Sequence, residues 1–108
     1  PVLLSCTDRT TKYQSPQIKY LYCIPEYPTP LSSLKFERIN FPTQYQGFSD
    51  HTVGLEAAKI AMARGAVIVE KHFTLNKDSH EGPDHCCSIE PYELKRLVEF
   101  AKRVEEAL

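Results

Sequence analysis

The stretch "GFSDHTVGLEAAKIAMARGAVIVEKHFTL", residues 47–75, contains the signals that decide the fold. Its second half has four apolar residues in a row, 66–69, which run directly into Glu70, Lys71 and His72. A short uninterrupted apolar run is typical of a strand in a parallel sheet, because helices cover such a strand on both faces. The two charges and the histidine mark the point where the chain leaves the sheet.

A helix is expected between this strand and the one before it. Apolar residues repeat at helical spacing over residues 54–64, and Gly65 lies where a C-terminal cap belongs. The connection 52–66 has the ordinary length of a crossover between parallel strands. Working outward from this unit, strands are expected in four segments: 1–6, 18–23, 44–49 and 66–72.

A longer amphipathic helix is expected at the end of the chain. Ser88 is a good N-cap for a helix that runs to Leu108. Residues 7–17 are expected to form a loop, and one short helix is expected over 33–39. The alternation of strands and helices predicts a single α/β domain over residues 1–108, with parallel strands. The last helix would lie on the sheet through one apolar stripe: Leu94, Leu97, Val98, Ala101, Val104 and Leu108.

Composition and charge exclude several functional classes. The chain has 108 residues, with 13 Lys and Arg against 14 Asp and Glu, and a formal net charge of −1. Because acids and bases are interspersed, neither nucleic acid nor an anionic membrane surface is indicated as a partner. No apolar run reaches the ~18 residues that a membrane span needs, and no signal-peptide pattern opens the sequence.

The cysteines are expected to be reduced thiols in a cytoplasmic protein. Cys86 and Cys87 are sequence neighbours, and a disulfide between neighbours is strained. The sequence shows no secretory features, so stabilisation by disulfides is the weaker alternative. The same expectation applies to the two remaining cysteines, Cys6 and Cys23.

Two consecutive strands end in polar residues with the same spacing. Glu70 and His72 share one face of their strand, and Ser49 and His51 repeat the two-residue spacing one strand earlier. Parallel α/β folds bind ligands at the carboxyl ends of their strands. If the strands are neighbours, about 4.8 Å apart, both imidazoles can reach one divalent metal at about 2.0–2.2 Å. The other coordination positions would be open to substrate oxygens and water.

The same residues also have structural interpretations. Each histidine, taken alone, is better explained as a surface or hydrogen-bonded residue just past its strand, and it is the repeat at two consecutive strand ends that favours the metal site. Asp50 and Lys71 have the opposite parity to the histidines. They are therefore expected to form a structural ion pair, or to hold the histidines in place without contacting the metal themselves.

The segment 76–88 is expected to be a loop over the same edge of the sheet. In it, Asp84 could accept hydrogen bonds from ligand hydroxyls, although a turn aspartate needs no ligand. A rival structural zinc site is offered by His80, His85, Cys86 and Cys87. The spacing argues against zinc, because it lacks a C-x2-C pair and adjacent cysteines chelate one tetrahedral ion poorly.

Several of these stretches occur together in a known family. With "YCIPEYPTP", "GFSDHTVGLEAA", "GAVIVEKHFTL" and "GPDH" in order, the chain resembles the sialic acid synthases, which include N-acetylneuraminate, legionaminate and pseudaminate synthases. The resemblance is strong over residues 45–108, good over 18–30 and weak over 1–6. It implies the second half of a (β/α)8 (TIM) barrel that condenses phosphoenolpyruvate with the open-chain aldehyde of an N-acetylated hexosamine.

The resemblance also implies a role for individual residues. His51 and His72 would hold Mn²⁺ or Mg²⁺, which acts as a Lewis acid on the aldehyde oxygen. Glu70 matches the carboxylate beside the metal, which could orient water or bond a sugar hydroxyl. The substrate-contacting residues implied are Ser49 and Ser5 for phosphoenolpyruvate, and Tyr27 and Asp84 for the sugar.

The sequence departs from the family pattern in two respects. Pro25 stands where the family often has a small polar residue, so a side-chain hydrogen bond is lost. Only the last four βα units are represented, without the first half of the barrel or the antifreeze-like domain that normally follows. We therefore expect a fragment, a homo-oligomer, or a chain completed by another, which by itself binds metal weakly and does not turn over.

Two other functions remain open. A non-catalytic α/β fragment or interaction module could keep these motifs by descent. The third hypothesis is a different metal-dependent aldolase built on the same barrel. Such an enzyme would use pyruvate in place of phosphoenolpyruvate. Metal titration of histidine variants tests the first alternative, and a comparison of the two substrates tests the second.

Overall fold

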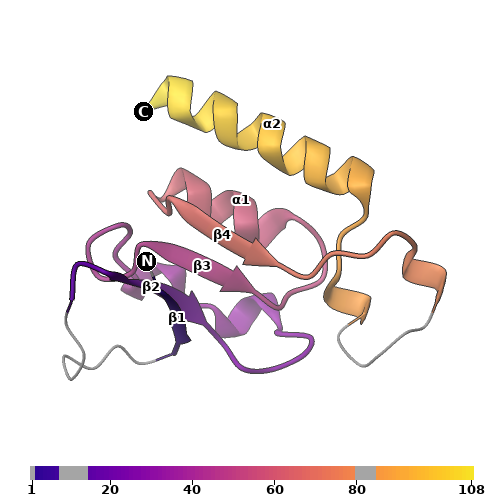
Figure 1. Ribbon diagram of the computed structural model, residues 1–108, viewed down its shortest axis with the longest axis horizontal. Coiled ribbons are helices and arrows are strands. Elements are labelled where there is room, and N and C mark those ends of the chain that lie inside the picture. Colours follow the sequence, from indigo (N-terminus) through magenta and orange to yellow (C-terminus); the bar gives the residue numbers. More distant parts are fainter. Residues whose placement is uncertain (1, 8–14, 80–84) are drawn as a thin grey trace.

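The computed structural model describes residues 2–7, 15–79 and 85–108 (Figure 1). The strands are β1 (Val2–Cys6), β2 (Ile18–Cys23), β3 (Gly47–Asp50) and β4 (Ile68–Lys71). The α-helices are α1 (Glu56–Ala63) and α2 (Pro91–Ala107). Short 3-10 turns lie at Leu31–Ser33, Phe36–Arg38, Lys77–Ser79 and His85–Cys87. Among the described residues, no helix is both long and apolar enough to cross a membrane.

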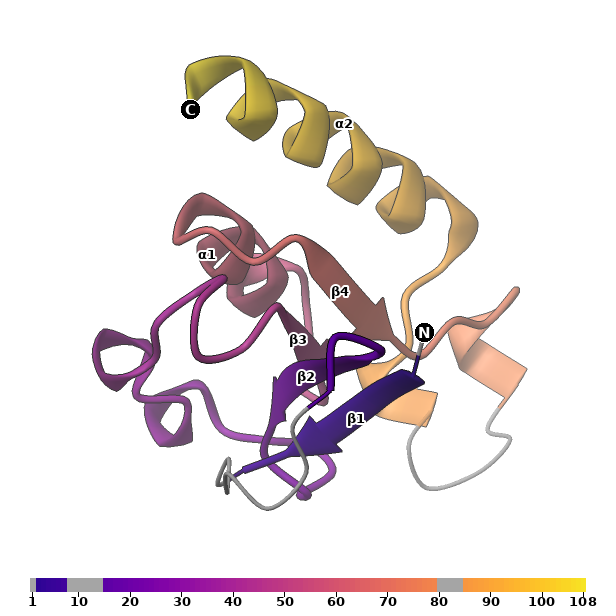
Figure 2. The same cartoon turned by 60° about the vertical axis from the view of Figure 1, so that its left-hand side comes forward.

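The strands form one parallel sheet in the order β1-β2-β3-β4. Consecutive strands are neighbours, and β1 and β4 lie at opposite edges (Figures 1 and 2). This confirms the predicted fold class, parallel βα units of a (β/α)8 barrel. The expected strands 44–49 and 66–72 are observed at slightly shifted bounds, as β3 and β4.

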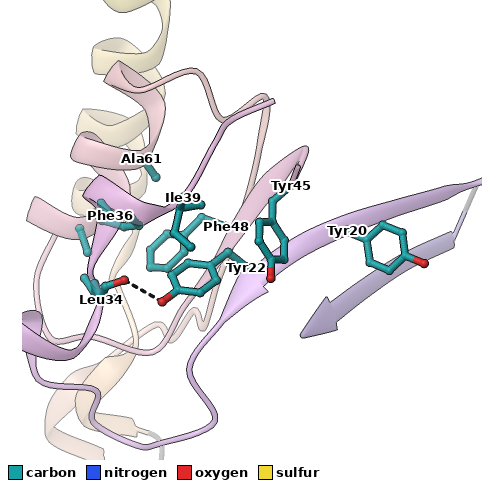
Figure 3. Close-up of a cluster of buried hydrophobic side chains, with 9 residues drawn as sticks. Tyr20, Tyr22, Leu34, Phe36, Ile39, Tyr45, Phe48 and Ala61 are labelled. Atoms are coloured by element: carbon teal, nitrogen blue, oxygen red, sulfur yellow. Dashed lines mark hydrogen bonds between the residues drawn. The ribbon is translucent and has the colours of Figure 1, made fainter. Parts of the chain in front are cut away.

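An aromatic core covers one face of the sheet (Figure 3). Tyr22 and Phe48 are adjacent in register and nearly inaccessible, and the Tyr22 hydroxyl donates a 2.7 Å hydrogen bond to the Leu34 carbonyl. That bond satisfies the polar end of a buried ring. The other buried members of this cluster come from four segments: Tyr20, Phe36, Ile39, Tyr45, Ala57 and Ala61.

Helix α1 ends as its sequence predicts. Gly65 has φ +109°, its N–H donates to the Met62 carbonyl, and the N–H of Ala66 donates to the Ala61 carbonyl. These two bonds make a Schellman motif, in which glycine relieves the strain of the left-handed conformation. The motif turns the chain back toward β4.

Helix α2 begins later than expected. Glu90, not Ser88, is the N-cap, and it exchanges a reciprocal capping box with Glu93. Ile89 instead forms an isolated parallel bridge with Phe73, so the segment before the helix extends the sheet edge. Pro91 at the first helical position fits this start, because proline lacks the N–H that would be unpaired there.

The stripe of α2 is only partly covered. Leu97 is buried against Ala58 and Ile89, whereas Leu94 and Val98 are 42% and 46% exposed. Figures 1 and 2 show α2 passing over α1 and the β4 edge. The helix thus packs on the sheet edge and on α1, and leaves one flank of its stripe open.

Two further expectations were wrong. No single helix forms over 33–39: two 3-10 turns, Leu31–Ser33 and Phe36–Arg38, are separated by Lys35, which is left-handed with φ 51°. The segment 66–72 is not covered on both faces, since Val67 is 70% exposed and the residues of β4 are at most partly buried. In the expected loop 7–17, residues 8–14 lie outside the described residues.

Candidate metal and substrate site

Three strand-end side chains form a row across the sheet. Cys23 of β2 is in register with Ser49 of β3, which is in register with Glu70 of β4. The Ser49 hydroxyl donates a 2.7 Å hydrogen bond to Glu70 Oε1, and Ser49 is buried while Glu70 is exposed. The row therefore places a hydroxyl and a carboxylate two residues before the two histidines, on the same face of the sheet.

The two histidine rings lie together beyond this row. The ring centroids of His51 and His72 are 5.9 Å apart, with planes inclined by 57°. The Tyr27 hydroxyl lies 3.0 Å from His51 Nε2 and 3.4 Å from His72 Nε2. The Tyr27 ring also stacks on His51 at 4.0 Å. The spacing read from the sequence thus brings both imidazoles to one rim of the sheet.

His51 is held in one orientation. Its Nδ1 lies 2.9 Å from the Ile24 carbonyl, which favours the tautomer that donates from Nδ1 and leaves the Nε2 lone pair accessible. Burial lowers the pKa of His51, against the raising effect of the Ile24 carbonyl. The neutral ring is the form that binds a metal. The His51 backbone is fixed too, since its carbonyl accepts from the Thr29 N–H at 2.9 Å.

The residues fit a divalent cation through two nitrogen ligands. Both Nε2 atoms face the Tyr27 hydroxyl, so a cation held by both would need the place that this hydroxyl takes between them. Among the described residues, no group of three or more His, Cys, Asp or Glu side chains could hold a metal. Substrate or water oxygens would have to supply the other ligands. The metal roles of His51 and His72 stay predictions.

Asp50 and Lys71 form an ion pair behind the histidines, as their parity indicated. Lys71 Nζ lies 3.0 Å from Asp50 Oδ2, and both side chains are almost fully buried. They lie on the opposite face of the sheet from Ser49 and Glu70, because each is one residue further along its strand.

Cys23 is a site neighbour that the sequence reading missed. Its Sγ lies 3.7 Å from His51 Nε2, and burial raises the pKa of its thiol, which favours the neutral form. The sequence contained a signal for this contact. Cys23 is the last residue of β2, and Ser49 and Glu70 are the residues before the last in β3 and β4. Thr7 adds a 2.6 Å hydrogen bond to the Cys23 carbonyl and so joins β1 to this row.

The remaining predicted residues are placed as follows. Ser5 pairs with Leu21, two residues nearer the amino ends than the Cys23–Ser49 pair, and it is exposed on β1. Asp84 lies outside the described residues. Their substrate roles therefore stay predictions.

The residues of the rival zinc site have other surroundings. His85 Nε2 lies 2.8 Å from the Asn76 carbonyl, while His80 lies outside the described residues. The sulfurs of Cys86 and Cys87 lie 3.6 Å apart, beyond the length of a disulfide bond. Burial raises the pKa of Cys87 to about 11, which disfavours the thiolate that zinc needs.

Comparison with known proteins identifies the class. Residues 4–108 match the model of the NeuB family, and the chain belongs to this family. It is 38% identical over 95 residues to N,N'-diacetyllegionaminic acid synthase of Campylobacter jejuni, covering 84% of this chain and 28% of the relative. It is 43% identical over 83 residues to N-acetylneuraminate-9-phosphate synthase of Drosophila melanogaster, covering 72% and 22%.

A solved structure agrees with this assignment. The N-acetylneuraminic acid (sialic acid) synthetase of Leptospira borgpetersenii serovar Hardjo-bovis, in complex with citrate, superposes with a TM-score of 0.75 at 31% identity. The match covers 83% of this chain and 33% of that one. The chain spans about a quarter of the length of the curated relatives it matches.

Proposed function

We propose that this chain contributes the metal-binding rim of a synthase that condenses phosphoenolpyruvate with the aldehyde of an N-acetylated hexosamine to a nonulosonic acid. The observation that supports this most is the meeting of His51, His72 and Tyr27 at the ends of adjacent strands in a NeuB-family chain. A bound Mn²⁺ or Mg²⁺ would supply Lewis acidity toward the aldehyde oxygen.

The other residues of the rim would bind and orient the substrates. Tyr27 is half exposed beside the histidines, so its hydroxyl can turn to a sugar hydroxyl, and we propose Asp84 as a second sugar contact. Ser49, with Ser5, would contact phosphoenolpyruvate. Glu70 is exposed and already accepts the Ser49 hydrogen, which suits a carboxylate that accepts a proton from water or a hydroxyl during addition.

The surroundings of the site lead to proposals about partners and compartment. We propose the cytoplasm as the compartment, because a disulfide between the neighbours Cys86 and Cys87 would be strained and the sequence shows no secretory features. Apolar residues are exposed on the β1 edge, Val2, Leu3 and Leu4 among them. A second copy or a further part of the barrel would cover them, and we expect no condensation by the 108-residue chain without it.

Substrate binding tests the proposal against the aldolase alternative. In the presence of Mn²⁺, phosphoenolpyruvate should bind the chain at least tenfold more tightly than pyruvate in a calorimetric titration. Ser49→Ala should lose most of this preference, while Ser32→Ala, on an exposed turn, should keep it. Equal binding of the two ligands would favour a pyruvate-dependent aldolase. Nonulosonic acid formed by the isolated chain would refute the expected inactivity.

A further inference from the structure

Each candidate metal ligand directly follows one member of a buried ion pair. Asp50 precedes His51 and Lys71 precedes His72, and the two charged residues are partners in the β3–β4 register. Lys71 Nζ lies 3.0 Å from Asp50 Oδ2, with the two side chains 3% and 0% exposed. The ion pair therefore joins the two strands at the last residues before the histidines.

Thr52 extends the same network around His51. Asp50 Oδ1 accepts from the Thr52 N–H at 2.8 Å and from the Thr52 hydroxyl at 2.6 Å. Lys71 Nζ donates to the Thr52 carbonyl at 2.8 Å. The residues on both sides of His51 are thus bonded to the residue that precedes His72. A shift of Lys71 relative to Asp50 would alter the direction of both imidazoles.

Stability alone does not account for charges at this position. Burying two ions costs desolvation that their attraction often only offsets, and well-packed apolar pairs are commonly as stable. Asp50 Oδ2 has no hydrogen bond from the described residues, so the Lys71 ammonium is what balances its charge. The pair is nevertheless directional, because it also binds both the N–H and the carbonyl of Thr52. This favours a geometric role.

We propose that Asp50, Lys71 and Thr52 are positioning residues that set the separation and direction of His51 and His72. The inference rests on the proposed metal site and adds how its two ligands are held in place. None of the three contacts the metal or substrate directly; they act through the backbone that leads to each imidazole.

Mn²⁺ affinity, measured by the loss of the free-ion EPR signal, tests the inference apart from activity. The main variant is the double replacement Asp50→Asn/Lys71→Met, which removes both charges and keeps an oxygen for the Thr52 bonds. Lys71→Arg keeps the charge, and Lys77→Met removes a different ion pair, the one with Glu93. Affinities are expressed per folded molecule, using the folded fraction from circular dichroism of the same sample.

The double variant should bind Mn²⁺ about tenfold more weakly per folded molecule, a loss in the range that supporting groups of a metal site produce. Lys71→Arg and Lys77→Met should stay within twofold of the wild type. A double variant within twofold of the wild type would overturn the positioning role. A wild type that binds no Mn²⁺, or binds it as well without His51 and His72, would instead overturn the proposed metal site and this inference with it.

Discussion

Strands β3 and β4 carry equivalent histidines but lie in very different surroundings. All four residues of β3 are buried, between β2 and β4 and beneath the aromatic core. Strand β4, the last in the described sheet, is only partly covered, although its Lys71 side chain is 3% exposed. His51 has a ring and a backbone fixed by hydrogen bonds, whereas His72 is half exposed and follows Lys71 on the strand. The site therefore combines one ligand fixed by several contacts with one on a less buried strand.

This difference shows that two equivalent residues of a short motif can differ in burial and in the number of contacts that fix them. His51 follows a buried strand and has its own contacts with the Ile24 carbonyl and the Thr29 N–H. The end of β4 is held by the bonds that Lys71 makes with Asp50 and Thr52. Substitutions of buried apolar residues in β3 should consequently reduce stability more than the corresponding substitutions in β4.

The largest contrast is expected between Phe48 and Val69, which are partners in register. Phe48→Ala should lower the free energy of unfolding by about 3–5 kcal/mol, because it empties a fully buried ring site. Val69→Ala should cost about 1 kcal/mol, because Val69 is only partly covered. Urea unfolding measures both. Equal losses would remove the distinction between the two strands.

The next largest effect on stability is expected at Gly47, where β3 approaches β4 closely. A Cβ on Gly47 would lie 2.1 Å from the Ile68 carbonyl oxygen, and rigid backbone cannot yield as a side chain does. Gly47→Ala should cost about 3 kcal/mol in the same unfolding experiment. At Gly54 the added atom would meet only the flexible end of Glu56, so Gly54→Ala should cost about 1 kcal/mol through its positive φ. A larger loss of stability in Gly54→Ala than in Gly47→Ala would contradict the close contact between β3 and β4.

How far the sequence predicted the molecule can be judged at particular residues. The parallel order followed from the apolar run and crossover length, and the histidine spacing brought two rings together. The later start of α2 had a local signal that was missed, since Pro91 suits the first helical position. The bridge from Ile89 to Phe73, sixteen residues upstream, had no such signal. The left-handed Lys35 has no sequence signal, since lysine is not a residue that favours a positive φ.

The candidate site shows the same division. Parity along each strand placed Ser49 with His51 and Glu70 with His72, and it put Asp50 and Lys71 behind them. It could not show that Cys23 approaches His51, because that contact depends on the register of a third strand. The position of Tyr27 between the rings likewise depends on a loop whose path no short pattern specifies.

A smaller effect, on Mn²⁺ affinity, is expected when the hydroxyl of Tyr27 is removed. Its hydroxyl uses the Nε2 lone pair of His51, which a cation also needs, so Tyr27→Phe should tighten Mn²⁺ binding about fivefold. Tyr92→Phe, on an exposed position of α2, is the matched control and should leave affinity unchanged. Weaker binding in Tyr27→Phe would mean that the phenol is itself a metal ligand.

The smallest expected effect is a pH dependence of stability without metal. Because burial lowers the pKa of His51, the unfolded chain takes up its proton first as the pH falls below about 6.5, the ordinary histidine value. Stability should therefore decline from pH 7 toward pH 5.5. In His51→Gln this decline should be shallower, as urea midpoints in the presence of a chelator would show. An unchanged slope would contradict the buried, neutral imidazole.

The central claim, that His51 and His72 converge on one cation, is tested most directly by Mn²⁺ titration of the wild type, His51→Ala and His72→Ala, with His85→Ala as the control. Each of the first two variants should lose at least tenfold in affinity, whereas the control should match the wild type. Equal affinities across all four proteins would contradict the account and leave the two rings as neighbours without a shared metal.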